Sequence, residues 1–122
     1  MFEVVFYEDE FGTKPVEDYY FELMAEAEKS KHGRIQYNKV VHFTKLLQQY
    51  GTRAGEEITK HLGGGLWELR PLDNRILFFG WIENKFVMLH HFKKRTQKTP
   101  QGEIDTAERR RTDWLQRNGG KG

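Results

Sequence analysis

Two segments decide the fold: residues 66–82, LWELRPLDNRILFFGWI, and residues 85–100, KFVMLHHFKKRTQKTP. Both runs are apolar in the middle and basic at their ends. Apolar segments of this length with turn residues between them are typical of neighbouring antiparallel strands. Pairing of the two runs brings arginine, histidine and lysine side chains near one another, and such a group suits phosphate chemistry without a metal.

Two strands and a turn are predicted in the first run. In LWELR, apolar and polar residues alternate, so Arg70 points away from the face that carries Trp67. Residues 71–74 supply a turn, because proline, aspartate and asparagine favour turn backbones. Residues 75–82 are nearly all apolar, as in a central strand covered on both faces. Arg70 and Arg75 therefore flank one hairpin turn.

A further strand is predicted over residues 86–94. Strict alternation divides its side chains between two faces: Val87, Leu89, His91 and Lys93 on one, and Phe86, Met88, His90, Phe92 and Lys94 on the other. Whichever face is inside, one histidine and one lysine emerge together, and the sequence leaves open which pair this is. Adjacent histidines in a strand point to opposite faces, which argues against a shared metal site.

The preceding part of the chain predicts one strand and two helices. Residues 4–7 are β-rich. A helix begins at Pro15, and apolar residues spaced by three and four carry it to about Gly33. A second helix covers residues 35–50 and ends at Gly51. We expect the two helices to form a hairpin over the sheet.

Residues 52–65 give a weaker pattern. A short helical turn is predicted at residues 56–61, followed by a flexible entry to the sheet at Gly63, Gly64 and Gly65. These glycines lack the lysine and Ser/Thr of a nucleotide P-loop, so a phosphate cradle is the second choice. After the last strand, Thr99 is the predicted cap of a helix that runs to about residue 117.

The chain of 122 residues fits one domain, and we expect residues 1–117 to form it and residues 118–122 to be a flexible tail. The expected class is α+β, with a four-stranded, antiparallel and partly mixed sheet, an N-terminal helical hairpin and a C-terminal helix, in the order β-α-α-β-β-β-α. There is no cysteine, which excludes disulfides and thiolate zinc sites. Charges interrupt every apolar run and no secretion signal is visible, so we expect a cytoplasmic protein without membrane contact.

Charge is distributed unevenly. Residues 1–30 contain nine acidic and two basic residues, whereas residues 85–122 contain ten basic and four acidic ones. The second region predicts a basic face that attracts a polyanion. The alternative is that these charges simply solvate helix surfaces.

The segments GLWELRPLDNRILFF (residues 65–79) and VMLHHFKKRTQKTPQGEIDTAERR (residues 87–110) together resemble the HigB-like branch of the RelE/ParE toxin superfamily. Its members are often labelled phage-derived proteins of type II toxin–antitoxin systems. The likeness spans residues 62–114. It implies the compact RelE-like fold and an endoribonuclease that cleaves mRNA in the ribosomal A site. It also implies a cognate antitoxin, of the helix-turn-helix HigA-like kind.

The chemistry needs no cofactor, because RNA supplies its own nucleophile, the 2′-OH. Arg75 resembles the strand arginine of the family and is expected to stabilise transition-state charge, with Arg70 orienting the phosphate. Histidine titrates near neutrality, so His91 or His90 is the expected proton carrier. The predicted catalytic residues are Arg70, Arg75, His91, Lys93 and Lys94. The predicted contacts with mRNA and ribosomal RNA are His90, Arg95, Lys98, Arg109 and Arg110.

Other interpretations stay open. Several relatives use a tyrosine near the C-terminus, and this chain has no tyrosine after Tyr50. A ParE-like inhibitor of DNA gyrase has the same fold, and a catalytically silent RNA- or ribosome-binding module needs only the basic face. In a purely structural interpretation, Glu68 pairs with Arg70, Arg75 caps the turn against Asp73, and the histidines bond within the core.

Overall fold

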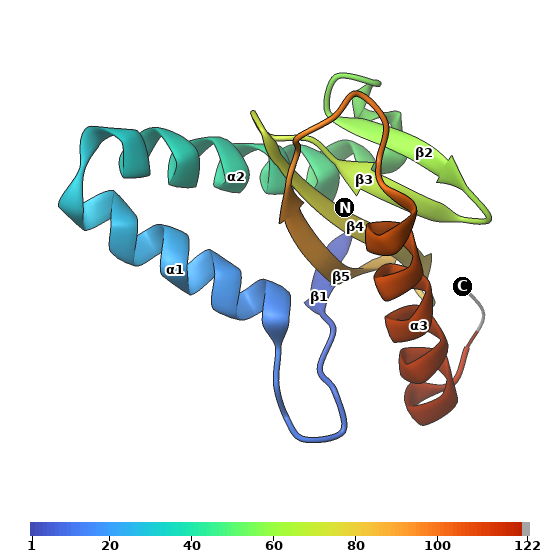
Figure 1. The fold of residues 1–122 in the computed structure, drawn as a ribbon. Helices are drawn as coiled ribbons and strands as arrows, with labels where there is room; N and C mark the ends of the chain where they lie inside the picture. Colours follow the sequence, from blue (N-terminus) through green and yellow to red (C-terminus); the bar gives the residue numbers. More distant parts are fainter. Residues whose placement is uncertain (121–122) are drawn as a thin grey trace.

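The computed structural model describes residues 1–120 and confirms the α+β class, with a helical hairpin after the first strand and a helix at the C-terminal end (Figure 1). The elements follow in chain order: β1 (Glu3–Phe6), α1 (Pro15–Lys29), α2 (Lys31–Tyr50), a 3₁₀ turn η1 (Gly51–Ala54), β2 (Thr59–Gly63), β3 (Leu66–Leu69), β4 (Asn74–Trp81), β5 (Lys85–Lys93) and α3 (Gln101–Asn118). The predicted tail at residues 118–122 extends into Lys121 and Gly122, which lie outside the described residues.

The sheet has five strands rather than the four predicted, in the order β1-β5-β4-β3-β2. Only the β1–β5 pair is parallel, and the other neighbours are antiparallel. The extra strand is β2, where a helical turn was expected. It pairs with β3 because Gly63, Gly64 and Gly65 adopt φ angles of 107°, 60° and 81°, which side chains rarely allow. Gly64 and Gly65 thus form the hairpin turn after Gly63, which ends β2, at the place where the sequence predicted a flexible entry to the sheet.

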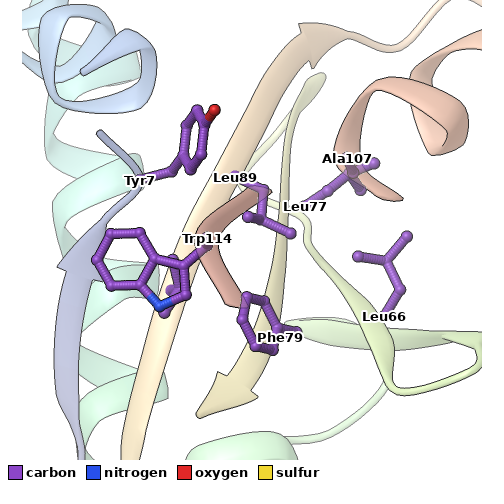
Figure 2. Close-up of a cluster of buried hydrophobic side chains, with 8 residues drawn as sticks. Tyr7, Leu66, Leu77, Phe79, Leu89, Ala107 and Trp114 are labelled. Carbon is purple, nitrogen blue, oxygen red and sulfur yellow. The ribbon is translucent and has the colours of Figure 1, made fainter. Parts of the chain in front are cut away.

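Two apolar layers cover the two faces of the sheet. The α1–α2 hairpin packs on one face through buried Val16, Val40 and Leu47. On the other face, Ala107 and Trp114 of α3 pack against strand side chains such as Leu77 and Phe79, and Figure 2 shows this cluster. In the part of the chain that the structure describes, no helix is long and apolar enough to cross a membrane.

The junction between α1 and α2 lies earlier than expected. Gly33 was predicted to end the first helix, but it lies in the first turn of α2. There its N–H donates to the Oγ of Ser30, the N-cap residue, at 2.9 Å. A Cβ at Gly33 would overlap the backbone carbonyl oxygen of Glu26 in α1. Gly33 therefore permits close helix packing. The predicted helix start at Pro15 and stop at Gly51 are confirmed.

A bulge in the β4–β5 ladder corrects the strict alternation predicted for the last strand. Leu77 pairs with His90 and Phe78 with Met88, so Leu89 has no partner in the ladder. Leu89 and His90 consequently both belong to the α3 face, and His91 belongs to the hairpin face. The predicted face sets were wrong after the bulge, because one extra residue reverses the alternation. Phe92 follows His90 onto the α3 face, where it packs against that cluster.

Candidate functional site

A buried carboxylate links three segments on the α3 face. Glu68 in β3 is 3% exposed and Arg75 in β4 is 6% exposed. Glu68 Oε2 lies 3.4 Å from Arg70 Nε and 3.8 Å from Arg75 Nε. The Thr99 hydroxyl donates to Glu68 Oε1 at 2.6 Å, so Thr99 does not cap α3 as predicted. Glu68 therefore ties β3 and β4 to the loop before α3.

The position of Arg75 is fixed by backbone acceptors. Its Nη1 donates to the carbonyl oxygens of Leu72 at 2.7 Å and Asn74 at 2.8 Å. Burial lowers the pKa of Arg75, and Glu68 partly offsets this, but a guanidinium stays charged at neutral pH. The remaining nitrogen, Nη2, has no hydrogen bond to any residue in the described range. Arg75 therefore keeps the N–H groups of Nη2 for a ligand.

Arg70 supports this arrangement from the β2 side. Its Nη1 donates to the backbone oxygen of Glu56 at 3.0 Å, and its Nε is buried without a hydrogen bond. The backbone N–H of Arg70 donates to the backbone oxygen of Ile58 at 2.9 Å. Two arginines thus share the single carboxylate of Glu68, which leaves this cluster with excess positive charge.

A small hollow of about 10 Å³ lies beside Arg75, and we call it the arginine pocket. Its walls are Glu68, Arg75, Phe92 and the basic loop, residues 94–100. Lys94, Arg95 and Lys98 form no salt bridge within residues 1–120. These cations are therefore available to a ligand, and several unpaired positive groups around one hollow favour an anion. Within the same range, no cluster of three or more histidine, aspartate or glutamate side chains is arranged for a metal ion.

Neither His90 nor His91 lines the arginine pocket. His91 lies on the hairpin face, where its ring stacks on Tyr19 with centroids 4.0 Å apart. Burial is the main cause that lowers the pKa of His91 to about 4. Lys93 pairs with Asn74 in the ladder and follows His91 onto the hairpin face. The structure therefore does not bring the predicted catalytic residues His91 and Lys93 together with Arg75.

His90 lies on the same face as Arg75 but binds to α3. Its Nε2 is 2.7 Å from Glu103 Oε1, and its Nδ1 is 3.3 Å from Arg110 Nη1. Burial lowers the pKa of His90, against a rise from the bond to Glu103. Arg110 also donates to the Leu89 oxygen at 2.9 Å, whereas the neighbouring Arg109 is exposed. Of the predicted site residues, the structure gathers Arg75, Lys94, Arg95 and Lys98 around one pocket.

The structural interpretation of the sequence paired Glu68 with Arg70, which is confirmed, but the contacts of Glu68 with Arg75 and Thr99 and the role of Asn74 were missed. Alternation in LWELR places Glu68 on the face of Arg70, which was a usable signal. Asn74 was expected only to form a turn. Instead its Oδ1 accepts from the Tyr19 hydroxyl at 2.6 Å, and its Nδ2 donates to Gln36 Oε1 at 2.8 Å. The helical hairpin therefore holds the residue just before Arg75, and no local pattern announces this long-range contact.

Comparison with known proteins places the chain in a family. The family model described as "Phage derived protein Gp49-like (DUF891)" matches residues 22–112, more than half of the chain. The matched range contains the arginine pocket and the α1–α2 hairpin from residue 22 onward. The search of curated proteins gave no match. The chain therefore belongs to the Gp49-like phage-derived protein family, a family of RelE/HigB-like toxins.

Proposed function

We propose that this protein is the toxin of a type II toxin–antitoxin system and acts as an endoribonuclease on mRNA in the ribosomal A site. The observation that carries the proposal is the arginine pocket, in which a fixed guanidinium and three cations without salt bridges surround a hollow. Membership of a family of RelE/HigB-like toxins supports it. The proposed place of action is the cytoplasm, where ribosomes translate.

The chemistry suits the charge of the pocket. The RNA 2′-OH attacks the adjacent phosphorus, its proton passes to a base, and the leaving 5′ oxygen takes a proton from an acid. The intermediate carries one more negative charge than the ground state. Arg75 Nη2 is the proposed donor to the phosphate oxygens, and Lys94 the second cation. Removal of one such donor typically lowers the rate by ~10² to 10³.

Glu68 is proposed as a positioning residue. It contacts Arg75 in the wall of the arginine pocket and accepts from Thr99 of the basic loop, so it orients the guanidinium while the hydroxyl bond holds the loop. A buried carboxylate also offsets part of the mutual repulsion between the two arginines. Glu68 therefore acts through Arg75 and Thr99 and does not contact the RNA in this proposal.

We propose His90, rather than His91, as the residue that transfers the proton. His90 shares the α3 face with Phe92, at a ring-centroid distance of 6.0 Å, and Phe92 lines the arginine pocket. His91 is stacked under Tyr19 on the opposite face. A carboxylate bonded to an imidazole orients the ring and stabilises its protonated form, so the 2.7 Å contact of His90 with Glu103 is compatible with such a role.

An antitoxin is the proposed protein partner, and it must block the arginine pocket or hold the helical hairpin. Burial of the exposed Lys98 and Arg95 by acidic side chains of the antitoxin would neutralise the basic loop. We expect the product of a neighbouring gene to form a stable complex with this chain and to rescue growth. Failure to bind or to rescue would count against this part of the proposal.

The test is brief expression of wild type, Arg75→Ala and Arg34→Ala in bacteria, with growth measurement and mapping of mRNA 5′ ends. Arg34 is an exposed arginine on α2, outside the arginine pocket. We expect wild type and Arg34→Ala to arrest growth with cleavage inside translated codons, and Arg75→Ala to do neither. Circular dichroism checks that the variants fold. Arrest with intact mRNA would contradict the proposal, and gyrase-linked DNA damage would favour a ParE-like inhibitor.

A further inference from the structure

A second hollow of about 340 Å³ lies on the α3 face, between the loop that follows β1 and the middle of α3. We call it the Phe11 pocket. Its walls include Tyr7 and Phe11 from the N-terminal side and Arg109, Arg110 and Asp113 from α3. None of these residues lines the arginine pocket. The proposed function therefore leaves this pocket without a role.

Phe11 is presented to solvent by an ordered loop. Asp9 Oδ1 accepts from the backbone N–H groups of Phe11 and Thr13, both at 2.9 Å. The N–H of Asp9 donates to the Thr13 oxygen at 2.9 Å, and that of Gly12 to the Asp9 oxygen at 3.1 Å. Despite this fixed backbone, Phe11 is 85% exposed. An aromatic ring that a fixed backbone presents to water is a surface on which a planar ligand can stack.

Two arginines of α3, Arg109 and Arg110, line the Phe11 pocket and can bind an anion next to that ring. Asp9 is occupied by the loop, and Asp113 accepts from the Tyr7 hydroxyl at 2.6 Å and from Arg117 Nη2 at 2.9 Å. Arg110 is held over the Tyr7 ring, 5.8 Å from its centroid. Arg109 is exposed and forms no salt bridge within residues 1–120.

One carboxylate remains uncommitted in the described range. Glu10 is exposed and lines the pocket without a hydrogen-bond or salt-bridge partner there. It lies beside Phe11 in the chain, on the loop side, whereas the free cation Arg109 lies on α3. A carboxylate close to a stacked base accepts from amino groups on the edge of that base. The pocket thus offers a ring, a cation and an acceptor in separate places.

We propose that the Phe11 pocket binds one nucleotide of single-stranded RNA, with its base stacked on Phe11 and its phosphate on Arg109 and Arg110. This rests on the proposed function, because the nucleotide would belong to the RNA strand that enters the arginine pocket. Pro100 lines the arginine pocket and Arg109 the Phe11 pocket. The helix between them covers roughly 14 Å at 1.5 Å per residue, which a short extended RNA segment spans.

The test measures binding of a fluorescent five-nucleotide RNA with 2′-O-methyl riboses, which cannot be cleaved through the 2′-OH, by anisotropy with the full chain. We expect Phe11→Ala and Phe11→Leu to weaken binding about tenfold and Phe11→Trp to retain it, because stacking needs a flat ring. Arg109→Ala should weaken binding and make it less dependent on salt. Phe21→Ala and Arg34→Ala, which change exposed residues on α1 and α2, should leave it unchanged.

Each other outcome has a defined meaning. If Phe11→Ala binds this RNA as wild type does, or if wild type does not bind it, the nucleotide site is wrong, whatever the growth assay shows. If Phe11→Ala instead weakens only the complex with the antitoxin, Phe11 belongs to a protein interface and the inference is also overturned. Intact mRNA in cells with Phe11-dependent RNA binding in solution would contradict the proposed nuclease and leave the nucleotide site standing.

Discussion

The two faces of the sheet use similar residues for different tasks near the end of β5. On the α3 face, arginines and a carboxylate surround a pocket with unpaired cations at its rim. On the hairpin face, His91 is stacked on Tyr19, and Asn74 is bonded to Tyr19 and Gln36. On the α3 face the positive charges outnumber the carboxylate that pairs with them. On the hairpin face, the side chains of His91 and Asn74 each have a partner within the fold. Several unpaired cations around one pocket are what distinguish a ligand site from a packed core.

The largest effect should follow from Arg75→Lys. An ammonium has its three donors on one atom and lacks the planar fork in which Nη1 bonds to the Leu72 and Asn74 oxygens while Nη2 stays available to phosphate. We expect the rate of mRNA cleavage to fall by ~10² to 10³. Single-turnover cleavage on programmed ribosomes measures this. Full activity in Arg75→Lys would mean that the α3 face is as purely structural as the hairpin face.

Glu68→Gln should act on stability and on activity together. Glutamine keeps an acceptor for Thr99 but removes the charge that balances Arg70 and Arg75, and we expect a loss of about 1–3 kcal/mol in the free energy of unfolding. Urea denaturation measures the loss. Glu108→Gln, which removes a more exposed partner of Arg111, is the control and should cost less.

His91→Ala and His90→Ala should separate the two faces. Without the stack on Tyr19, we expect His91→Ala to lower the free energy of unfolding by about 1 kcal/mol while cleavage by the folded protein persists. His90→Ala should reduce cleavage instead. Paired stability and cleavage assays on both variants decide this. Loss of cleavage in His91→Ala alone would restore His91 as the catalytic histidine.

The effect that is smallest near neutral pH should be a dependence of stability on pH. The pKa of His91 is about 4 in the folded chain, against 6.5 for an ordinary histidine. The unfolded chain binds a proton as the pH falls below about 6.5 while the folded chain does not, so the free energy of unfolding should fall between pH 7 and pH 4. His91→Phe, which keeps a ring on Tyr19, should show a shallower fall in urea titrations. His32→Phe should resemble wild type.

Most of the fold followed from the sequence because its signals are local. Pro15 and Gly51 bound the helical hairpin, and apolar runs marked β4 and β5. The strand β2 was missed because its sequence, TKHLG, contains no apolar run. Only its pairing with β3 makes Thr59–Gly63 extended. Gly33 was misread because a glycine that ends a helix and one that admits a neighbouring helix look alike in sequence.

Part of the site was also predicted, because some of its residues give local signals in the sequence. Arg75 stood out as a charge that opens an apolar strand, and the basic loop was visible as a charge cluster. The face of each histidine depends on the bulge at Leu89, and a one-residue bulge has no signature in LHHF. Asn74 is held by contacts from α1 and α2, which sequence patterns along one strand do not report.

The parallel pairing of β1 with β5 also determines when β1 can join the sheet during synthesis of the chain. Glu3 pairs with Lys85, and the arginine pocket needs residues up to Pro100. At roughly 5–20 residues per second, the ribosome needs on the order of 4–16 s to go from β1 to its partner strand. The first strand made is thus among the last to find its place. A nascent chain has no assembled arginine pocket until most of its own message has been translated.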